Sequence, residues 1–191
     1  MHDKDRQHPH GGSACRKTEK GGRAVGYFMP DACLGRHTEL TVERLRADGV
    51  RALVLDIDNT LEPYENPDAT EPTLLWLRSL TEAGIRIAFV SNNGRERVER
   101  FNRPFSFPYY YKAKKPFAVN IRRALADMSV KAEEAALMGD QIFTDVLAAH
   151  NAGLRAYLVP PIKDKTDVLT RFKRLLERPI LKRYQKKEKH T

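Results

Sequence analysis

The chain has 191 residues, a formal net charge of +9 and 41% hydrophobic residues, which suits one compact domain rather than two. No apolar run approaches the roughly 18 residues that cross a bilayer, and the polar first 22 residues have no apolar signal region, so a spanning or secreted protein is not expected. Two cysteines, Cys15 and Cys33, argue against a disulfide framework and favour a cytoplasmic protein.

The positive charge is concentrated towards the ends of the chain. Residues 162–191 contain eleven Lys or Arg and four acids, whereas residues 23–161 contain 18 of each sign. Residues 1–22 are polar and have no periodicity. We therefore expect a disordered tail over 1–22, a globular domain over 23–161 and a basic C-terminal segment over 162–191.

Short apolar segments alternate with helical ones from residue 41 onwards. The pattern predicts helices at 41–48, 72–83, 96–101, 117–128 and 144–152, and strands at 51–55, 85–90, 135–138 and 154–159. Continuous apolar strands separated by helices favour an α/β fold with a parallel sheet that is covered on both faces. Ligands of such sheets bind at the carboxyl ends of the strands.

The strand predicted at 51–55 is followed by two aspartates. Asp56 and Asp58 are two residues apart on extended backbone, so their side chains point to the same side. Neighbouring carboxylates repel each other unless a positive group lies beside them. A magnesium ion would serve, because it favours one or two carboxylates together with phosphate oxygens. The alternative is that the pair only caps the following turn.

Polar groups also follow the strand predicted at 85–90. Ser91 and Asn92 offer a hydroxyl and an amide beside backbone N–H groups, which suits a phosphate oxygen. The same residues are also typical of a helix cap.

Two more candidates lie further along the chain. Lys114 and Lys115 precede a helix, where a lysine can neutralise a phosphate, although most lysines are only solvated. Asp140 follows the strand at 135–138, and Asp145 lies about one helical turn further; Asp140 alone also suits a cap. Each cluster taken alone has an ordinary structural explanation. Four such clusters at successive strand ends are not explained in this way, so together they indicate a functional site.

This order of carboxylate pair, hydroxyl, lysine and carboxylate resembles the haloacid dehalogenase (HAD) superfamily of aspartate-nucleophile phosphotransferases over roughly residues 50–160. The resemblance implies a Rossmann-like, three-layer sandwich with a central parallel sheet. It also implies that Asp56 is the nucleophile and that Asp58 protonates the leaving oxygen and then activates water. Asp58 argues against the dehalogenases and ion-pumping ATPases of the superfamily, which have other residues there.

The resemblance further assigns the groups that bind metal and phosphate. Mg²⁺ would be held by the Asp56 carboxylate, the Asp58 backbone carbonyl and the Asp140 carboxylate, with Asp145 orienting the metal shell. The phosphoryl group would be bound by Ser91, Asn92 and Lys115; Lys115 is preferred to Lys114 because the family lysine usually precedes a proline.

The lengths of the segments between the motifs indicate which subfamily the chain resembles. Residues 60–91 and 94–114 are too short to hold a cap domain, so we expect an open site that accepts phosphate on a large molecule. The motifs resemble the capless subfamily IIIA, which includes phosphatidylglycerophosphate phosphatases of Gram-positive bacteria, yeast mitochondria and plants. The implied reaction releases phosphatidylglycerol and phosphate.

The C-terminal segment has an amphipathic pattern. Its apolar residues Val168, Leu169, Phe172, Leu175 and Leu176 fall on one stripe of a helix that is otherwise basic. This helix either lies on anionic lipid, with Ile180, Leu181 and Tyr184 continuing the contact, or packs its stripe on the domain. The first alternative predicts a cytoplasmic protein that associates peripherally with the inner face of the membrane.

A second basic group lies near the expected site entrance, where it would receive a second substrate phosphate or a nucleic-acid backbone: Arg95, Arg97, Arg100, Arg103, Lys112, Arg122 and Arg123. Rival functions are a phosphatase for a nucleotide, a sugar phosphate or a nucleic-acid end, and a non-catalytic nucleic-acid-binding protein. No nucleic-acid-binding motif is present, so a nucleic-acid partner is not expected. The sequence does not indicate an oligomeric state.

Overall fold

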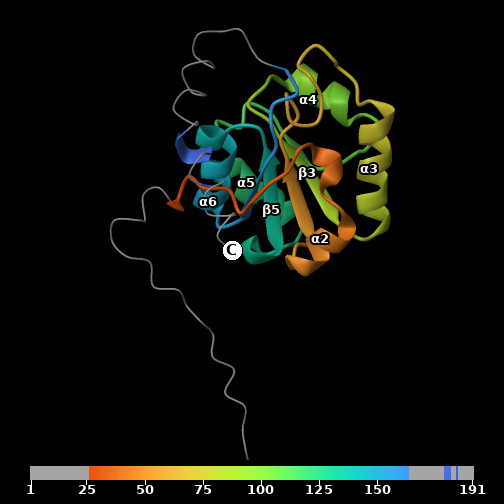
Figure 1. Cartoon of the computed structure of the whole chain (residues 1–191). Helices are drawn as coiled ribbons and strands as arrows, with labels where there is room; N and C mark the ends of the chain where they lie inside the picture. Colours follow the sequence, from red (N-terminus) through yellow and green to blue (C-terminus); the bar gives the residue numbers. More distant parts are fainter. Residues whose placement is uncertain (1–25, 164–178, 182–183, 185–191) are drawn as a thin grey trace, which may run out of the picture.

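The computed structural model describes residues 26–163, 179–181 and 184 (Figure 1). The tail predicted at 1–22 and most of the segment 162–191 lie outside these residues. The described strands form one fully parallel sheet in the order β1-β6-β5-β2-β3-β4. Their bounds are β1 (Ala32–Cys33), β2 (Ala52–Leu55), β3 (Arg86–Val90), β4 (Tyr109–Tyr110), β5 (Ala135–Gly139) and β6 (Arg155–Leu158).

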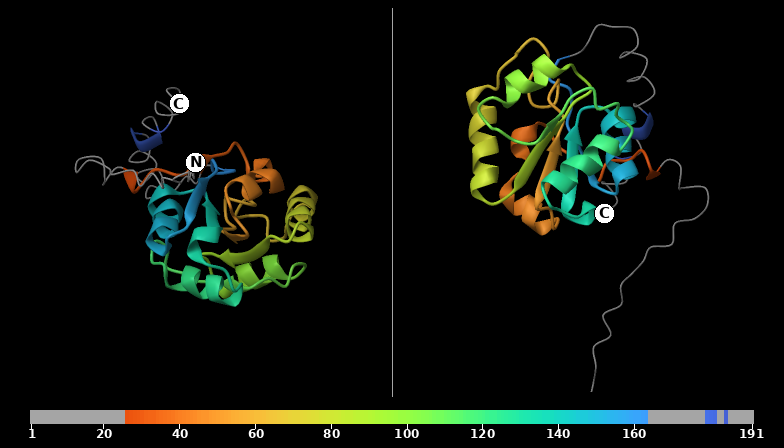
Figure 2. Two further views of the ribbon diagram at one scale, coloured as in Figure 1. Left: turned by 90° about the horizontal axis from the view of Figure 1, so that it is seen from below. Right: turned by 180° about the vertical axis from the view of Figure 1, so that it is seen from behind.

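Helices cover both faces of this sheet (Figure 2). They are α2 (Val42–Ala47), α3 (Glu71–Glu82), α4 (Arg95–Asn102), α5 (Val119–Asp127) and α6 (Leu147–Ala152), with short turns η1 (His37–Glu39), η2 (Ala132–Glu134) and the π-helical η3 (Ile142–Val146). The Thr41 side chain accepts a hydrogen bond from the Arg44 amide at 3.2 Å and so caps α2 as its sequence predicts.

Alternation along the strands divides the core between the two faces. On β2, Leu53 and Leu55 pack with α2, α3 and α4, whereas Ala52 and Val54 pack with α5 and α6. All four side chains are fully buried. The expected three-layer α/β sandwich is therefore confirmed, and no further folded unit interrupts residues 60–115.

Strand β2 is the topological switch point of the sheet, where the order in which strands are added reverses. The chain adds β3 and β4 on one side of β2 and then returns to add β5 on the other side. Because all strands are parallel, the residues after β2, β3 and β5 meet at one edge of the sheet. The loop between β2 and α3 lies at this edge, opposite the end where α2 lies (Figure 1).

Three elements differ from the sequence-based expectation. Strands β1 and β4 were not predicted, because two residues are too few to show a strand period. The helix predicted at 144–152 begins earlier, as the turn η3 at Ile142. The additional strands extend the predicted sheet at its two ends without changing the layers.

The described part of the C-terminal segment packs on the domain. Ile180 and Leu181 contact the core on the α5–α6 face, and Tyr184 is buried. The alternative in which these three residues contact lipid is therefore wrong for them. The amphipathic stripe at 168–176 lies outside the described residues. Within residues 26–163, 179–181 and 184, no helix is long and apolar enough to cross a membrane.

A histidine joins the N-terminal end of the domain to α6. The Nε2 atom of His150 lies 3.6 Å from an Asp31 carboxylate oxygen, and its Nδ1 atom lies 2.6 Å from the Tyr27 carbonyl oxygen. The interaction with the Asp31 carboxylate is the main reason that the pKa of His150 lies above its ordinary value. The protonated imidazole is thus favoured by the folded state.

This contact predicts a pH-dependent stability. Because folding raises the pKa of His150, its contribution is complete below the unfolded-state pKa of about 6.5 and is lost as pH rises through the folded-state pKa. We expect Asp31→Asn to reduce the drop in Tm between pH 6 and pH 9 relative to the wild type. An unchanged pH dependence in thermal unfolding would contradict this assignment.

Candidate active site

Side chains from four separate segments meet at the carboxyl edge of the sheet. Asp56 follows β2, Ser91 follows β3 and Asp140 follows β5, while Lys115 comes from the loop between β4 and α5. All four are buried. The edge holds a cavity of about 280 Å³, lined by Asp56, Asp58, Tyr64, Ser91, Asn92, Asn93, Lys115, Gln141 and Thr144.

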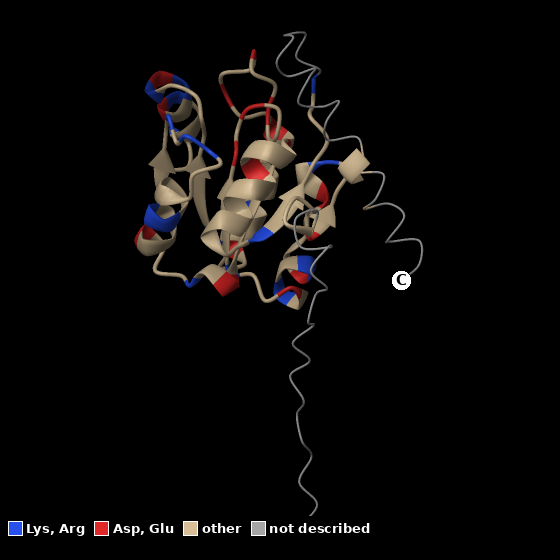
Figure 3. Ribbon diagram, turned by 90° about the vertical axis from the view of Figure 1, so that its left-hand side faces the viewer, with Lys and Arg blue, Asp and Glu red and all other residues tan. Residues whose placement is uncertain are grey.

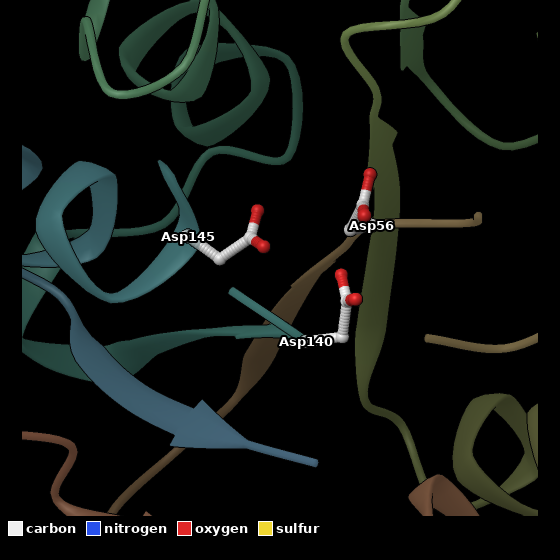
Figure 4. A group of neighbouring side chains, drawn as sticks. All are labelled: Asp56, Asp140 and Asp145. Atoms are coloured by element: carbon white, nitrogen blue, oxygen red, sulfur yellow. The ribbon is translucent and has the colours of Figure 1, made fainter. Parts of the chain in front are cut away.

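Three aspartates converge beside this cavity (Figure 4). One oxygen each of Asp56, Asp140 and Asp145 lies within 4.8 Å of the others, and all three residues are buried. The resemblance implied one ion held by Asp56, Asp140 and the Asp58 backbone carbonyl, with Asp145 orienting the metal shell. The structure brings Asp145 into the same cluster.

Lys115 lies between two of these carboxylates. Its Nζ atom is 2.8 Å from Asp56 Oδ1 and 2.6 Å from Asp145 Oδ1, and its side chain is 2% exposed. Burial favours the neutral amine, but the two carboxylates prevail and raise the pKa of Lys115, which stays protonated. Lys114 is exposed to solvent, so it is Lys115 that the fold brings to the site.

Burial has the opposite consequence for Asp56. Desolvation, together with repulsion from Asp145 and Asp58, outweighs the Lys115 charge and raises the pKa of Asp56 to about 6. The three clustered carboxylates carry more negative charge than Lys115 balances. This excess and the exclusively oxygen donor set fit a hard divalent cation such as Mg²⁺.

Asn92 holds the backbone of Lys115. Its Oδ1 atom accepts from the Lys115 amide at 2.7 Å, and its Nδ2 group donates to the Lys115 carbonyl at 3.3 Å. The nearby Ser91 hydroxyl accepts from the Asn93 amide at 3.1 Å. The geometry therefore gives Asn92 a positioning function that the sequence did not indicate, while phosphate binding by Ser91 and Asn92 stays a prediction.

Asp58 is held by two side chains from the β3–α4 region. Arg97 Nε donates to its Oδ1 atom at 3.0 Å, and Asn93 Nδ2 donates to its Oδ2 atom at 3.0 Å. Arg97 also donates to the Pro67 carbonyl at 2.7 Å, which connects Asp58 to the loop before α3. The ion pair is largely buried, with side chains 11% and 10% exposed.

Glu62 stabilises the same loop through hydrogen bonds to two threonines. Its Oε1 atom accepts from the Thr70 amide at 2.9 Å, the Thr70 hydroxyl at 2.6 Å and the Thr73 hydroxyl at 2.7 Å. Thr73 in turn lies 3.2 Å from His37 Nε2. This partly buried network fixes the chain between Asp58 and α3.

The basic group expected at the entrance is not a free cluster. Arg97 pairs with Asp58, Arg95 with Glu99 and Arg100 with Asp68. The guanidinium of Arg122 donates to the Asn151 carbonyl, away from the cavity. Acids in the domain therefore pair with three members of the group, and its binding of a second substrate phosphate stays a prediction.

Comparison with known proteins agrees with this geometry. Residues 112–174 match a family model described as HAD-hydrolase-like. The chain is 36% identical over 161 residues to "Probable phosphatase YqeG" from Bacillus subtilis (strain 168), covering 84% of this chain and 94% of the relative.

The chain belongs to the HAD-like hydrolase family.

This HAD-like hydrolase is accordingly an enzyme of the phosphatase class, which sets aside a purely non-catalytic protein. Among solved structures it is similar to the cobalt-bound deoxy-D-mannose-octulosonate 8-phosphate phosphatase YrbI of Haemophilus influenzae, with a TM-score of 0.49, 15% identity and coverage of 59% of this chain and 69% of that one. It is also similar to an uncharacterized protein of Listeria monocytogenes serotype 4b, with a TM-score of 0.47, 17% identity and coverage of 68% and 99%.

Gly139, at the end of β5, is a further requirement of the site. A Cβ atom at this position would lie 2.2 Å from Asp145 Cγ and 2.4 Å from its Cβ. Asp145 is fixed there, because its Oδ2 atom also accepts from the Gln141 amide at 3.1 Å. Position 139 must therefore be glycine if Asp145 is to keep its contact with Lys115.

Gly139→Ala is expected to displace Asp145 and to lower kcat at least tenfold, since small misplacements in a catalytic site are costly. Gly26→Ala is the matched control, because a Cβ atom there meets nothing within 4 Å. Steady-state kinetics on a soluble phosphomonoester would test this. Wild-type kcat in Gly139→Ala would contradict the requirement.

Arg97 contacts the Asp58 carboxylate and is expected to orient it. We expect Arg97→Met to reduce kcat by about 10- to 100-fold. This loss is smaller than the full contribution of general acid–base catalysis, because Asp58 is misplaced and not removed. Arg97→Lys should recover part of the loss. Arg100→Met, which removes an exposed ion pair from the same helix, should leave kcat unchanged. Equal kinetics of the two methionine variants would disprove the positioning function of Arg97.

Proposed function

We propose that this phosphatase is a Mg²⁺-dependent phosphomonoesterase that acts through an aspartyl-phosphate and dephosphorylates phosphatidylglycerophosphate to phosphatidylglycerol. The observation that carries the reaction type is the contact of Lys115 with Asp56 within a buried cluster that also contains Asp140 and Asp145. A nucleophilic carboxylate held against a fixed cation beside a cavity suits attack on phosphorus.

The metal would be held by Asp56, Asp140 and the backbone carbonyl of Asp58, with Asp145 beside them. When bound, Mg²⁺ would neutralise charge on the phosphoryl group and on the clustered carboxylates. Lys115 supplies the fixed positive charge of the chain itself. Ser91 and Asn92, which line the same cavity, are proposed to bind phosphoryl oxygens.

The proposed reaction has two steps. The Asp56 carboxylate attacks phosphorus and the ester P–O bond breaks. Asp58, which takes up a proton from solvent before this step, donates it to the leaving alcohol oxygen. Asp58, now a carboxylate, then accepts a proton from a water that attacks phosphorus, and the bond from phosphorus to Asp56 breaks to release phosphate. Arg97 and Asn93 would keep Asp58 within reach of both oxygens.

The substrate proposal rests on the openness of the site and on the resemblance to subfamily IIIA. The cavity of about 280 Å³ suits a phosphate and part of a headgroup, and within the described part of the chain no cap covers it. A phosphomonoester on a lipid can reach such a site while its acyl chains stay in the bilayer. We accordingly place the enzyme at the inner face of the membrane, as a peripheral protein.

Turnover on different phosphomonoesters tests the proposal. With Mg²⁺, phosphatidylglycerophosphate in mixed micelles should be hydrolysed with a higher kcat/KM than a nucleotide, a sugar phosphate or a phosphorylated oligonucleotide end. EDTA should abolish all turnover and Mg²⁺ should restore it. A higher kcat/KM on a soluble ester would replace the lipid substrate, and EDTA-resistant turnover would overturn the metal requirement.

A further inference from the structure

The loop that carries Lys115 into the site borders the cavity, because Lys115 is one of the residues that line it. This segment, residues 111–119, is called the lysine-loop rim here. It is anchored to the loop after β3, since the Lys112 amide donates to the Asn93 carbonyl at 2.8 Å and the Ala113 amide donates to the Ser91 carbonyl at 3.0 Å. Its position relative to the catalytic groups is therefore fixed.

Buried and exposed residues are interleaved along the rim. Ala113, Lys115 and Ala118 are at most 7% exposed and face the domain. The side chains that face solvent are apolar or cationic: Tyr111 (38% exposed), Phe117 (68%) and Val119 (56%), together with the exposed lysines 112 and 114. Three exposed apolar side chains within nine residues are more than the single exposed apolar residues that are ordinary on a protein surface.

Charge distinguishes this rim from the loop between β2 and α3. No acidic residue occurs between 111 and 126. The loop between β2 and α3, by contrast, is acidic (Figure 3), and its Glu65 and Asp68 side chains are 62% and 64% exposed. A partner that binds the rim must therefore accept apolar side chains and offer negative charge.

We propose that the lysine-loop rim docks the enzyme on a bilayer that contains anionic lipid, with Phe117 at the depth of the headgroups. Aromatic and aliphatic side chains flanked by lysines are the composition that interfacial membrane contacts use. The inference rests on the proposed function, because docking beside Lys115 turns the cavity mouth towards a lipid phosphomonoester in the same bilayer. It also assigns the contact to the catalytic edge, and not to Ile180, Leu181 and Tyr184.

Fluorescence of an added tryptophan tests the orientation without turnover. In full-length Asp56→Asn protein, Phe117→Trp and Leu75→Trp introduce the indole at the rim and at an exposed position of α3, while the native Trp76 is buried. We expect brominated vesicles of phosphatidylcholine and phosphatidylglycerol to quench the indole introduced at position 117 and to leave the one at position 75 unquenched. Equal quenching at the two positions, or none at position 117, in protein that sediments with the vesicles would overturn the proposal.

Sedimentation with the same vesicles measures the contribution of each side chain. Substituting Lys112 or Lys114 by Ser should lower the partition coefficient about fivefold per lysine, and added salt should reduce it further. Phe117→Ser should lower it by roughly tenfold, whereas Leu75→Ser should not change it. No sedimentation at low salt, or binding to RNA or to a protein in place of vesicles, would reject the membrane docking. A rim that binds vesicles while phosphatidylglycerophosphate is not hydrolysed would reject the substrate alone.

Discussion

Asp56→Asn is expected to reduce phosphatase turnover by about 10⁴-fold or more, as removal of a catalytic nucleophile does. The amide has nearly the shape of the carboxylate but cannot form an acyl phosphate. The fold should persist, because Lys115 keeps its contact with Asp145 at 2.6 Å. Phosphate release with and without Mg²⁺, together with circular dichroism, would measure both effects.

The control for this variant is Asp68→Asn, which changes an exposed carboxylate on the loop before α3. It should retain wild-type turnover. Substantial turnover in Asp56→Asn would remove Asp56 from the nucleophile role. Loss of the folded circular dichroism spectrum would show instead that the carboxylate is needed for structure.

Lys115→Met is expected to have the largest effect on stability. The substitution leaves Asp56 and Asp145 buried without their cation, and breaking a buried ion pair costs about 3–5 kcal/mol. Turnover should fall as well, because the fixed charge beside the nucleophile is lost. Urea unfolding in EDTA would measure the change in the free energy of unfolding.

Lys114→Met is the matched control for stability, since Lys114 is exposed. Its free energy of unfolding should stay within about 0.5 kcal/mol of the wild type, as for most surface substitutions. A similar loss in both variants would mean that the contacts of Lys115 with the two carboxylates contribute little to stability.

The sequence was sufficient to predict the layers of the fold and the convergence of the main site residues. Ala52–Leu55 and Ala135–Gly139 are continuous apolar strands, and parallel strands bring the residues after them, Asp56 and Asp140, to one edge. Neither the pairing of β4 nor that of β1 could be predicted, because a two-residue strand is defined by its neighbour in the sheet rather than by its own pattern.

The supporting contacts could not be predicted, because they depend on positions in space. Arg97 reaches Asp58 across 39 residues of sequence, and nothing in the spacing of α4 selects it over the other arginines of that helix. Asn92 is a residue type that can bind phosphate, yet its side-chain amide forms hydrogen bonds with the backbone of Lys115. The need for Gly139 follows only from the atoms of Asp145 above it.

The charge imbalance at the site has a consequence for the lifetime of the protein in the cell. Without a bound cation, the cluster of Asp56, Asp140 and Asp145 repels itself, and unfolding relieves that repulsion. A ligand that binds only the folded state adds to its stability in proportion to the logarithm of its concentration. If Mg²⁺ is that ligand, magnesium starvation should increase the unfolded fraction exposed to proteases, so that the abundance of the enzyme follows the supply of its metal.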